Sequence, residues 1–160
     1  MIVVSDASPL NYLALIGELE VLPRMFTLVA IPTQVHEELL RSRAPGVVRA
    51  WADDLPAWVE IHPNIQGQFD QLDSGESAAL TLAASLGCSL LVDEAKARMV
   101  ARDIGVPAVG TIGVLERAAL VGMIDLEPIF EKLRQTSFRA SESLYEVAIQ
   151  RVRRHDHLDR

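Results

Sequence analysis

Acidic residues stand at positions where their side chains could meet at one edge of a sheet. Asp6 follows the apolar run IVVS and Asp93 follows SLLV, so each comes directly after an expected strand. Glu76 lies in the first turn of an expected helix over 74–86, whose far end leads into the Asp93 strand. In open parallel sheets, ligands bind beyond the carboxyl ends of the strands. We therefore expect Asp6, Glu76 and Asp93 to approach the same edge.

A fourth acid comes from the helix expected over 32–43, which offers Glu37 and Glu38. At about 100° per residue, Glu38 lies about 60° from Val35, whereas Glu37 lies about 160° from it. Val35 is expected to pack inward. We therefore assign Glu38 to the site and Glu37 to solvent.

Each of these acids also has a simpler structural explanation. Asp6 and Asp93 could each cap the helix that follows, Glu76 could complement a helix dipole, and Glu38 could pair with an arginine. These explanations do not account for the convergence, because neighbouring carboxylates repel one another unless a cation offsets their charge. Oxygen ligands suit Mg²⁺ or Mn²⁺, and the four histidines are poorly placed for a softer zinc site. Carboxylate clusters that hold such ions commonly serve phosphoryl chemistry.

The elements that must position these acids alternate along the chain. Short aliphatic runs predict strands at 2–5, 27–31, 58–61, 89–92 and 107–110. Helical patterns and caps predict helices at 8–16, 32–43, 74–86, 94–104, 111–121, 126–136 and 141–154. Strands separated by helices of about ten residues indicate crossover units, and hence an α/β fold with a mostly parallel, covered sheet.

Composition limits the class of protein. The chain has 160 residues, 49% of them apolar, and a mean hydropathy of +0.19, which suits a single domain with one core. A lone Cys88 excludes a disulfide within the chain and favours a reducing compartment. The N-terminus lacks the basic region of a signal peptide, and no apolar run is long enough to cross a bilayer. We therefore expect a cytoplasmic protein without a membrane partner.

The net charge of −7 argues against broad electrostatic attraction to nucleic acid. The charge is uneven, however. From Lys132 onward there are seven Lys or Arg and four Asp or Glu, a net charge of +3, so the preceding residues carry −10. An acidic body with a basic tail is compatible with a site that gathers cations.

Four motifs, in order along the chain, resemble a known family. They are VVSDASPLNYLA, IPTQVHEEL, LDSGESAALTLAASLGCSLLVDEAKAR and GVPAVGTIGVLERAALVGMI. Together they resemble the PIN domain, and within that family they are most similar to the short VapC-like toxins of prokaryotic toxin–antitoxin systems. The resemblance covers residues 1–137 as a nuclease domain, with 138–160 as a C-terminal helix and basic polar tail that belongs to the same domain or is partly flexible.

The resemblance implies a three-layer α/β/α sandwich and Mg²⁺- or Mn²⁺-dependent cleavage of RNA by metal-activated water, leaving a 3′-hydroxyl and a 5′-phosphate. It also implies a homodimer and a small antitoxin protein as partner. By position it makes Asp6, Glu38, Glu76 and Asp93 the catalytic, metal-binding set, with Ser8 and Thr111 as supporting hydroxyls. Many short toxins have Asp where this chain has Glu76, and the basic tail matches none of the motifs.

Other residues have less specific interpretations. Lys96, Arg98 and Arg102 follow Asp93 on one helix and could contact an RNA backbone, although a solvated helix face is the simpler reading. For Trp51 and Trp58 we expect packing or a dimer contact in preference to stacking on bases.

Two alternative functions stay open from the sequence. One is a phosphohydrolase of another α/β type that acts on a small phosphoester, with an Asp nucleophile after the first strand. The other is a PIN-like module that binds RNA or a protein without cleaving.

Overall fold

The computed structural model describes residues 1–41 and 43–160, and its centre is a parallel sheet. The strands in these residues are β1 (Ile2–Ser5), β2 (Leu28–Pro32), β3 (Val59–His62), β4 (Ser89–Leu91) and β5 (Ala108–Val109). Their order is β3-β2-β1-β4-β5, and every neighbouring pair is parallel. The predicted α/β fold is confirmed.

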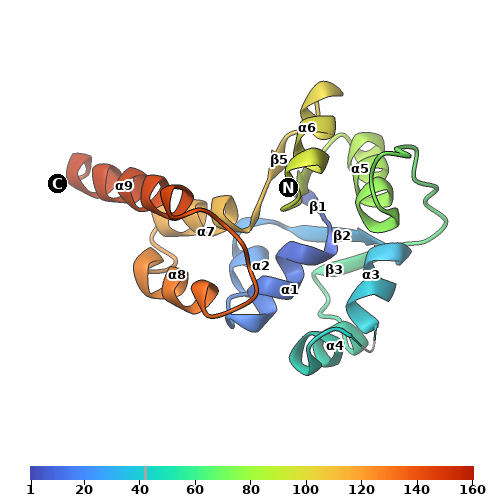
Figure 1. The fold of residues 1–160 in the computed structure, drawn as a ribbon, viewed down its shortest axis with the longest axis horizontal. Helices are drawn as coiled ribbons and strands as arrows, with labels where there is room; N and C mark the ends of the chain where they lie inside the picture. The colour runs from blue at the N-terminus through green and yellow to red at the C-terminus, as the bar shows by residue number, and fades with distance from the viewer. Residues whose placement is uncertain (42) are drawn as a thin grey trace.

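Helices connect the strands and extend the chain beyond the sheet. Those within the described residues are α1 (Ala7–Leu15), α2 (Val21–Met25), α3 (Thr33–Leu40), α4 (Gly46–Asp53), α5 (Ser74–Leu86), α6 (Ala95–Asp103), α7 (Thr111–Leu120), α8 (Leu126–Arg134) and α9 (Glu142–Leu158). Helix α5 packs on β1, β2 and β4 and contacts α6, whereas α1 contacts α3, α4 and α7. Figure 1 shows α5 and α6 on one side of the sheet and α1 and α2 on the other.

The central strands are apolar because helices cover both of their faces. In β1, Val3 and Val4 are fully buried, and in β4 Leu90 is fully buried as well. The edge strand β3 differs, since its first and last residues are half-buried and its two middle residues are exposed. A parallel sheet enclosed in this way requires near-continuous apolar runs in its inner strands. This requirement is why short aliphatic runs predicted the strand positions well.

Several helix boundaries differ from the sequence prediction. Helix α1 begins at Ala7, with Asp6 and not Ser8 at the N-cap position. Helix α3 ends at Leu40, short of the predicted 43, and residue 42 of that prediction lies outside the described residues. Helices α2 and α4 were not predicted.

The C-terminal helix α9 packs against α7 and α8. Tyr145 and Ala148 are its buried residues, and the helix continues to Leu158, four residues beyond the predicted end. In Figure 1, α9 (red) carries the C-terminus to one end of the long axis of the molecule. Among the helices described, none combines the length and apolar character that a bilayer crossing requires.

Candidate active site

An open cleft of about 660 Å³ lies where the chain leaves the central strands β1 and β4. It is bordered by α1, α3 and the beginning of α5, and by residues that follow α3 and α8. The acidic residues that line it are Asp6, Glu38, Asp73, Glu76, Asp93 and Glu94. All four acids selected from the sequence therefore face one cleft, together with two others.

Asp6 is the most buried of these acids. It follows β1 directly, its backbone amide donates to the Leu91 carbonyl at 2.9 Å, and the residue is 6% exposed. Its side chain makes no helix-capping hydrogen bond, and its Oδ1 has no hydrogen-bond partner. Burial raises the pKa of this carboxyl to about 8, and repulsion from neighbouring acids, Glu38 first, adds to the rise, while the nearby Ala7 amide opposes it. Asp6 is thus a buried acid with an unused acceptor.

Asp93 is held in place by three hydrogen bonds from two other segments. Its Oδ2 accepts from the Ser8 hydroxyl at 2.6 Å and from the Thr111 hydroxyl at 2.8 Å, and its Oδ1 accepts from the Thr111 amide at 2.7 Å. Helix α6 starts at Ala95 with Glu94 at its N-cap position, so Asp93 does not cap it. A carboxylate has about four lone-pair positions, and three donors leave one for a further ligand.

Glu38 and Glu37 point in different directions from α3. Glu38 is half-buried and lines the cleft, whereas Glu37 is exposed and lies outside the lining. Burial raises the pKa of Glu38, and repulsion from Asp73 acts in the same direction, while Arg41 opposes both. The arginine reduces the repulsion, but it does not form an ion pair with Glu38.

Glu76 belongs to a capping box at the start of α5. The Asp73 Oδ1 accepts from the Glu76 amide at 2.8 Å, and the Glu76 Oε1 accepts from the Asp73 amide at 3.2 Å. Burial raises the pKa of Glu76, with repulsion from Asp73 and Glu94 adding to it. Sequence reasoning missed Asp73, although an Asp three residues before a Glu, just ahead of an apolar run, is the signature of such a box.

Gly75 lets these acids approach one another. A Cβ on Gly75 would lie 2.9 Å from Glu38 Oε2, 3.4 Å from Asp6 Oδ1 and 3.7 Å from Asp73 Oδ1. Carboxylate oxygens from three segments of the chain therefore surround a space that any larger residue would fill.

The donor set fits a hard divalent cation. It consists of oxygen atoms, it includes the unpartnered Asp6 Oδ1, and none of the ion pairs formed by the described residues involves a cleft acid. None of the four histidines lines the cleft. The fit is one of donor chemistry and not of present geometry, because in residues 1–41 and 43–160 no three His, Cys, Asp or Glu side chains are placed to hold one metal ion together.

The basic residues of the cleft are not those expected from the sequence. Lys96 and Arg102 are exposed on α6 and lie outside the lining, and Arg98 bonds the main-chain oxygen of Asp93. The arginines that do line the cleft are Arg41, Arg43 and Arg139. Sequence reasoning missed Arg41 and Arg43 because it placed both in a helix over 32–43, whereas α3 ends at Leu40. Arg139 was missed because it lies between helices, where no periodic pattern gives its direction.

The aromatic residues of the cleft also differ from those considered first. Trp51 and Trp58 pack against each other, with ring centroids 6.0 Å apart, outside the cleft lining. The aromatic rings in the lining are instead those of Tyr12 and Phe138.

A family model and a solved structure are similar to this chain. A family model described as DUF3368, PIN domain, matches residues 2–154, which extends past residue 137 into α9. No curated protein matches the chain in sequence. Among solved structures, the chain is similar to a PilT N-terminus domain protein from the hyperthermophilic archaeon Sulfolobus solfataricus P2, with 14% identity, a TM-score of 0.49, and coverage of 88% of this chain and 100% of that one. PIN domains are generally metal-dependent nucleases. Because the family model spans nearly the whole sequence, this chain belongs to the PIN domain family.

Proposed function

We propose that this chain is a Mg²⁺- or Mn²⁺-dependent ribonuclease that acts as the toxin of a toxin–antitoxin pair. The observation that carries the proposal is the gathering of Asp6, Glu38, Glu76 and Asp93 in one open cleft without an ion-paired cation. Such an arrangement costs stability through repulsion and desolvation, which a bound divalent cation would offset.

The residues that would hold the ion are Asp6, Asp93 and Glu76, with Glu38 beside them. When bound, a divalent cation activates water and stabilises the charge that develops during in-line displacement at a phosphodiester. The protein's own part is to fix its ligands. Ser8 and Thr111 orient Asp93, and the capping box engages only one of the two Glu76 carboxylate oxygens.

The cleft also needs groups that bind the substrate. Phosphate oxygens are bound by arginines, and Arg41, Arg43 and Arg139 lie in the lining beside the acids. The choice of RNA, a homodimer and an antitoxin partner rests on the similarity of the motifs to short toxins. The toxin role predicts that expression of the chain alone arrests growth, and that a small protein encoded next to it relieves the arrest.

A cleavage assay with a matched pair of variants tests the enzymatic proposal. The substrates are mixed single-stranded RNA, single-stranded DNA and a small aryl phosphoester, each with Mg²⁺, with Mn²⁺ and with EDTA. Glu38→Gln and Asp93→Asn should each reduce RNA cleavage at least ~100-fold. Glu37→Gln, one residue away and exposed, should leave it unchanged.

The three functions considered give different results in this assay. RNA cleavage that requires metal and Glu38 supports the proposal. Turnover of the phosphoester alone indicates a different phosphohydrolase, and RNA binding without cleavage indicates a non-cleaving module. RNA cleavage that persists undiminished in Asp93→Asn contradicts the assigned site.

A further inference from the structure

The cleft has an aromatic and basic wall that the acid cluster does not explain. Tyr12, Ser137, Phe138 and Arg139 line it, and we call these four residues the aromatic wall. Tyr12 and Phe138 are half-buried, and Arg139 is exposed. The Tyr12 and Phe138 rings meet edge to face, with centroids 4.9 Å apart and an interplanar angle of 76°. In this geometry one ring covers a face of the other, and its own faces are not covered by that partner.

The segment that carries Phe138 and Arg139 is held in place by local hydrogen bonds. The Thr136 hydroxyl donates to the Leu133 carbonyl at 2.6 Å and accepts from the Phe138 amide at 3.1 Å. The Tyr12 hydroxyl and the Ser137 hydroxyl are 3.0 Å apart, which joins the segment to α1. The wall is therefore built from defined contacts between α1 and the chain that follows α8.

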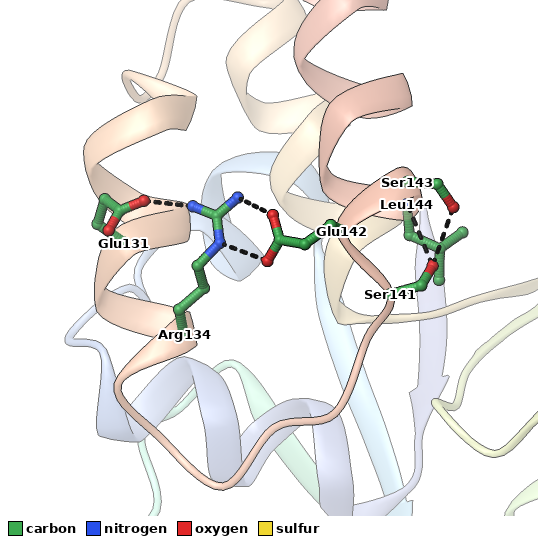
Figure 2. A network of polar contacts seen from close by, with 6 residues as sticks. All are labelled: Glu131, Arg134, Ser141, Glu142, Ser143 and Leu144. Atoms are coloured by element: carbon green, nitrogen blue, oxygen red, sulfur yellow. Dashed lines mark hydrogen bonds and ion pairs between the residues drawn. The ribbon is translucent and has the colours of Figure 1, made fainter.

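Arg134 joins the two ends of this segment, as Figure 2 shows. From the end of α8 it pairs with Glu131 and reaches Glu142 at the start of α9, with two N···O distances of 3.3 Å. Its guanidinium also lies over the Tyr145 ring, 4.4 Å from the centroid. Ser141 caps α9 by accepting from the Leu144 amide at 3.4 Å. Residues 135–141 thus form a loop whose two ends are joined by the Arg134–Glu142 ion pair.

The wall lies close to the acids along α1. Ser8 donates to Asp93, and Tyr12 is four residues further on the same helix, so both side chains share one face. One turn of helix separates them by about 6 Å along the axis. A group bound at Tyr12 would therefore lie beside a phosphate bound at the acids.

We propose that the aromatic wall binds single-stranded RNA next to the position of cleavage, with an unpaired base stacked on the face of the Phe138 ring, which Tyr12 supports edge to face, and a phosphate bound by Arg139. The proposal rests on the ribonuclease function above and adds the residues that bind the nucleotide next to the cleaved bond. Stacking on an exposed ring requires a base that is free of its own neighbours, so the wall selects unpaired nucleotides. It also gives Arg139, the first basic residue of segment 138–160, a defined role.

Binding measurements separate this inference from the cleavage reaction. In the Asp93→Asn background with Mg²⁺, the Kd is measured by fluorescence anisotropy for an end-labelled single-stranded RNA, for the same RNA as a duplex, and for a series with one abasic position each. Phe138→Leu should weaken binding of the intact single strand by ~5- to 150-fold, the range expected for one lost stack. Phe138→Tyr, which keeps the ring, should restore it. One RNA of the abasic series, the one that lacks the stacked base, should bind the parent and Phe138→Leu with the same Kd.

Arg139→Gln gives a second test that does not depend on packing. It should weaken binding and lower the slope of log K against log salt by about one contact, whereas Arg24→Gln, exposed on α2 and outside the lining, should change neither. In the active protein, Phe138→Leu should raise KM with little change in kcat. Equal affinity of the parent and Phe138→Leu, equal preference for the duplex, or no RNA binding at all would overturn the inference. Cleavage that is absent while binding still responds to Phe138 would refute the nuclease function and keep the inference.

Discussion

Asp6→Asn should stabilise the metal-free protein while it abolishes activity. Folding raises the pKa of Asp6 to about 8, against about 3.9 in an unfolded chain. The folded protein therefore keeps the carboxyl protonated where the unfolded chain ionises it. The stability from this group is complete below about pH 4 and is lost as pH rises through the folded pKa. Asparagine does not titrate, so the variant avoids this loss.

The size of the effect follows from the same linkage. Each pH unit between the two pKa values costs the wild type up to about 1.4 kcal/mol, or about 4 kcal/mol by pH 7. Because the cleft is open and water can approach, we expect about 2–4 kcal/mol. For a chain of this size that corresponds to a Tm higher by roughly 5–15 °C. The raised pKa values of Glu38 and Glu76 act in both proteins and largely cancel in the difference.

Urea unfolding in EDTA from pH 4 to pH 8.5 measures this difference. The two proteins should be equally stable at pH 4, and the gain of Asp6→Asn should grow up to about pH 8. Glu37→Gln, exposed and outside the cleft, should follow the wild type throughout. With Mg²⁺ at about 1,000 times its Kd the order should reverse, because this excess of ligand stabilises the wild type by about 4.1 kcal/mol and the variant lacks a ligand. A difference that stays constant with pH would refute the reasoning.

Three further variants examine the supports of the site. Thr111→Val removes one hydrogen-bond donor from Asp93, so the cleavage rate should fall ~10- to 100-fold. The free energy of unfolding should fall by about 1–2 kcal/mol. An unchanged kcat would show that the hydroxyl is dispensable. Gly75→Ala places a Cβ 2.9 Å from Glu38 Oε2, so Mg²⁺ affinity and cleavage should each fall at least ~10-fold. The Tm should hardly change, since alanine favours the helix by about 1 kcal/mol. Calorimetric titration with Mg²⁺ measures the loss of affinity. Arg134→Met removes the contacts that join the two ends of the loop after α8, so the KM for RNA should rise. The free energy of unfolding should fall by about 1 kcal/mol. An unaltered KM would show that the loop does not contribute to substrate binding.

Much of the frame could be predicted because its signals are local. Helix α5 matches its predicted bounds of 74–86, since an acidic first turn marks its start and Gly87, with φ of 64°, marks its end. Asp6 and Asp93 were found because a buried strand that stops at a carboxylate is unusual, and Glu38 was separated from Glu37 by helical angle alone. Their role as metal ligands stays a prediction.

The rest depends on contacts between distant segments. Helices α2 and α4 were missed because they are short and lack distinct caps. The cleft arginines and three of the four wall residues (137–139) lie in connections, where direction is set by packing and not by periodicity. Ser8 and Thr111 were expected as supporting hydroxyls, but that both bond Asp93 followed only from bringing β1, β4 and β5 side by side.

The hydrogen bonds to Asp93 make the site a late product of chain synthesis. Ser8 is 85 residues before Asp93 and Thr111 is 18 residues after it. Until the ribosome has released residue 111, the carboxylate lacks two of its three donors and β4 lacks its outer neighbour. Contacts of such sequence separation form only when the chain closes on itself. A partly synthesised or truncated chain that ends before α7 would therefore have the acids but not the hydrogen bonds that hold Asp93 among them.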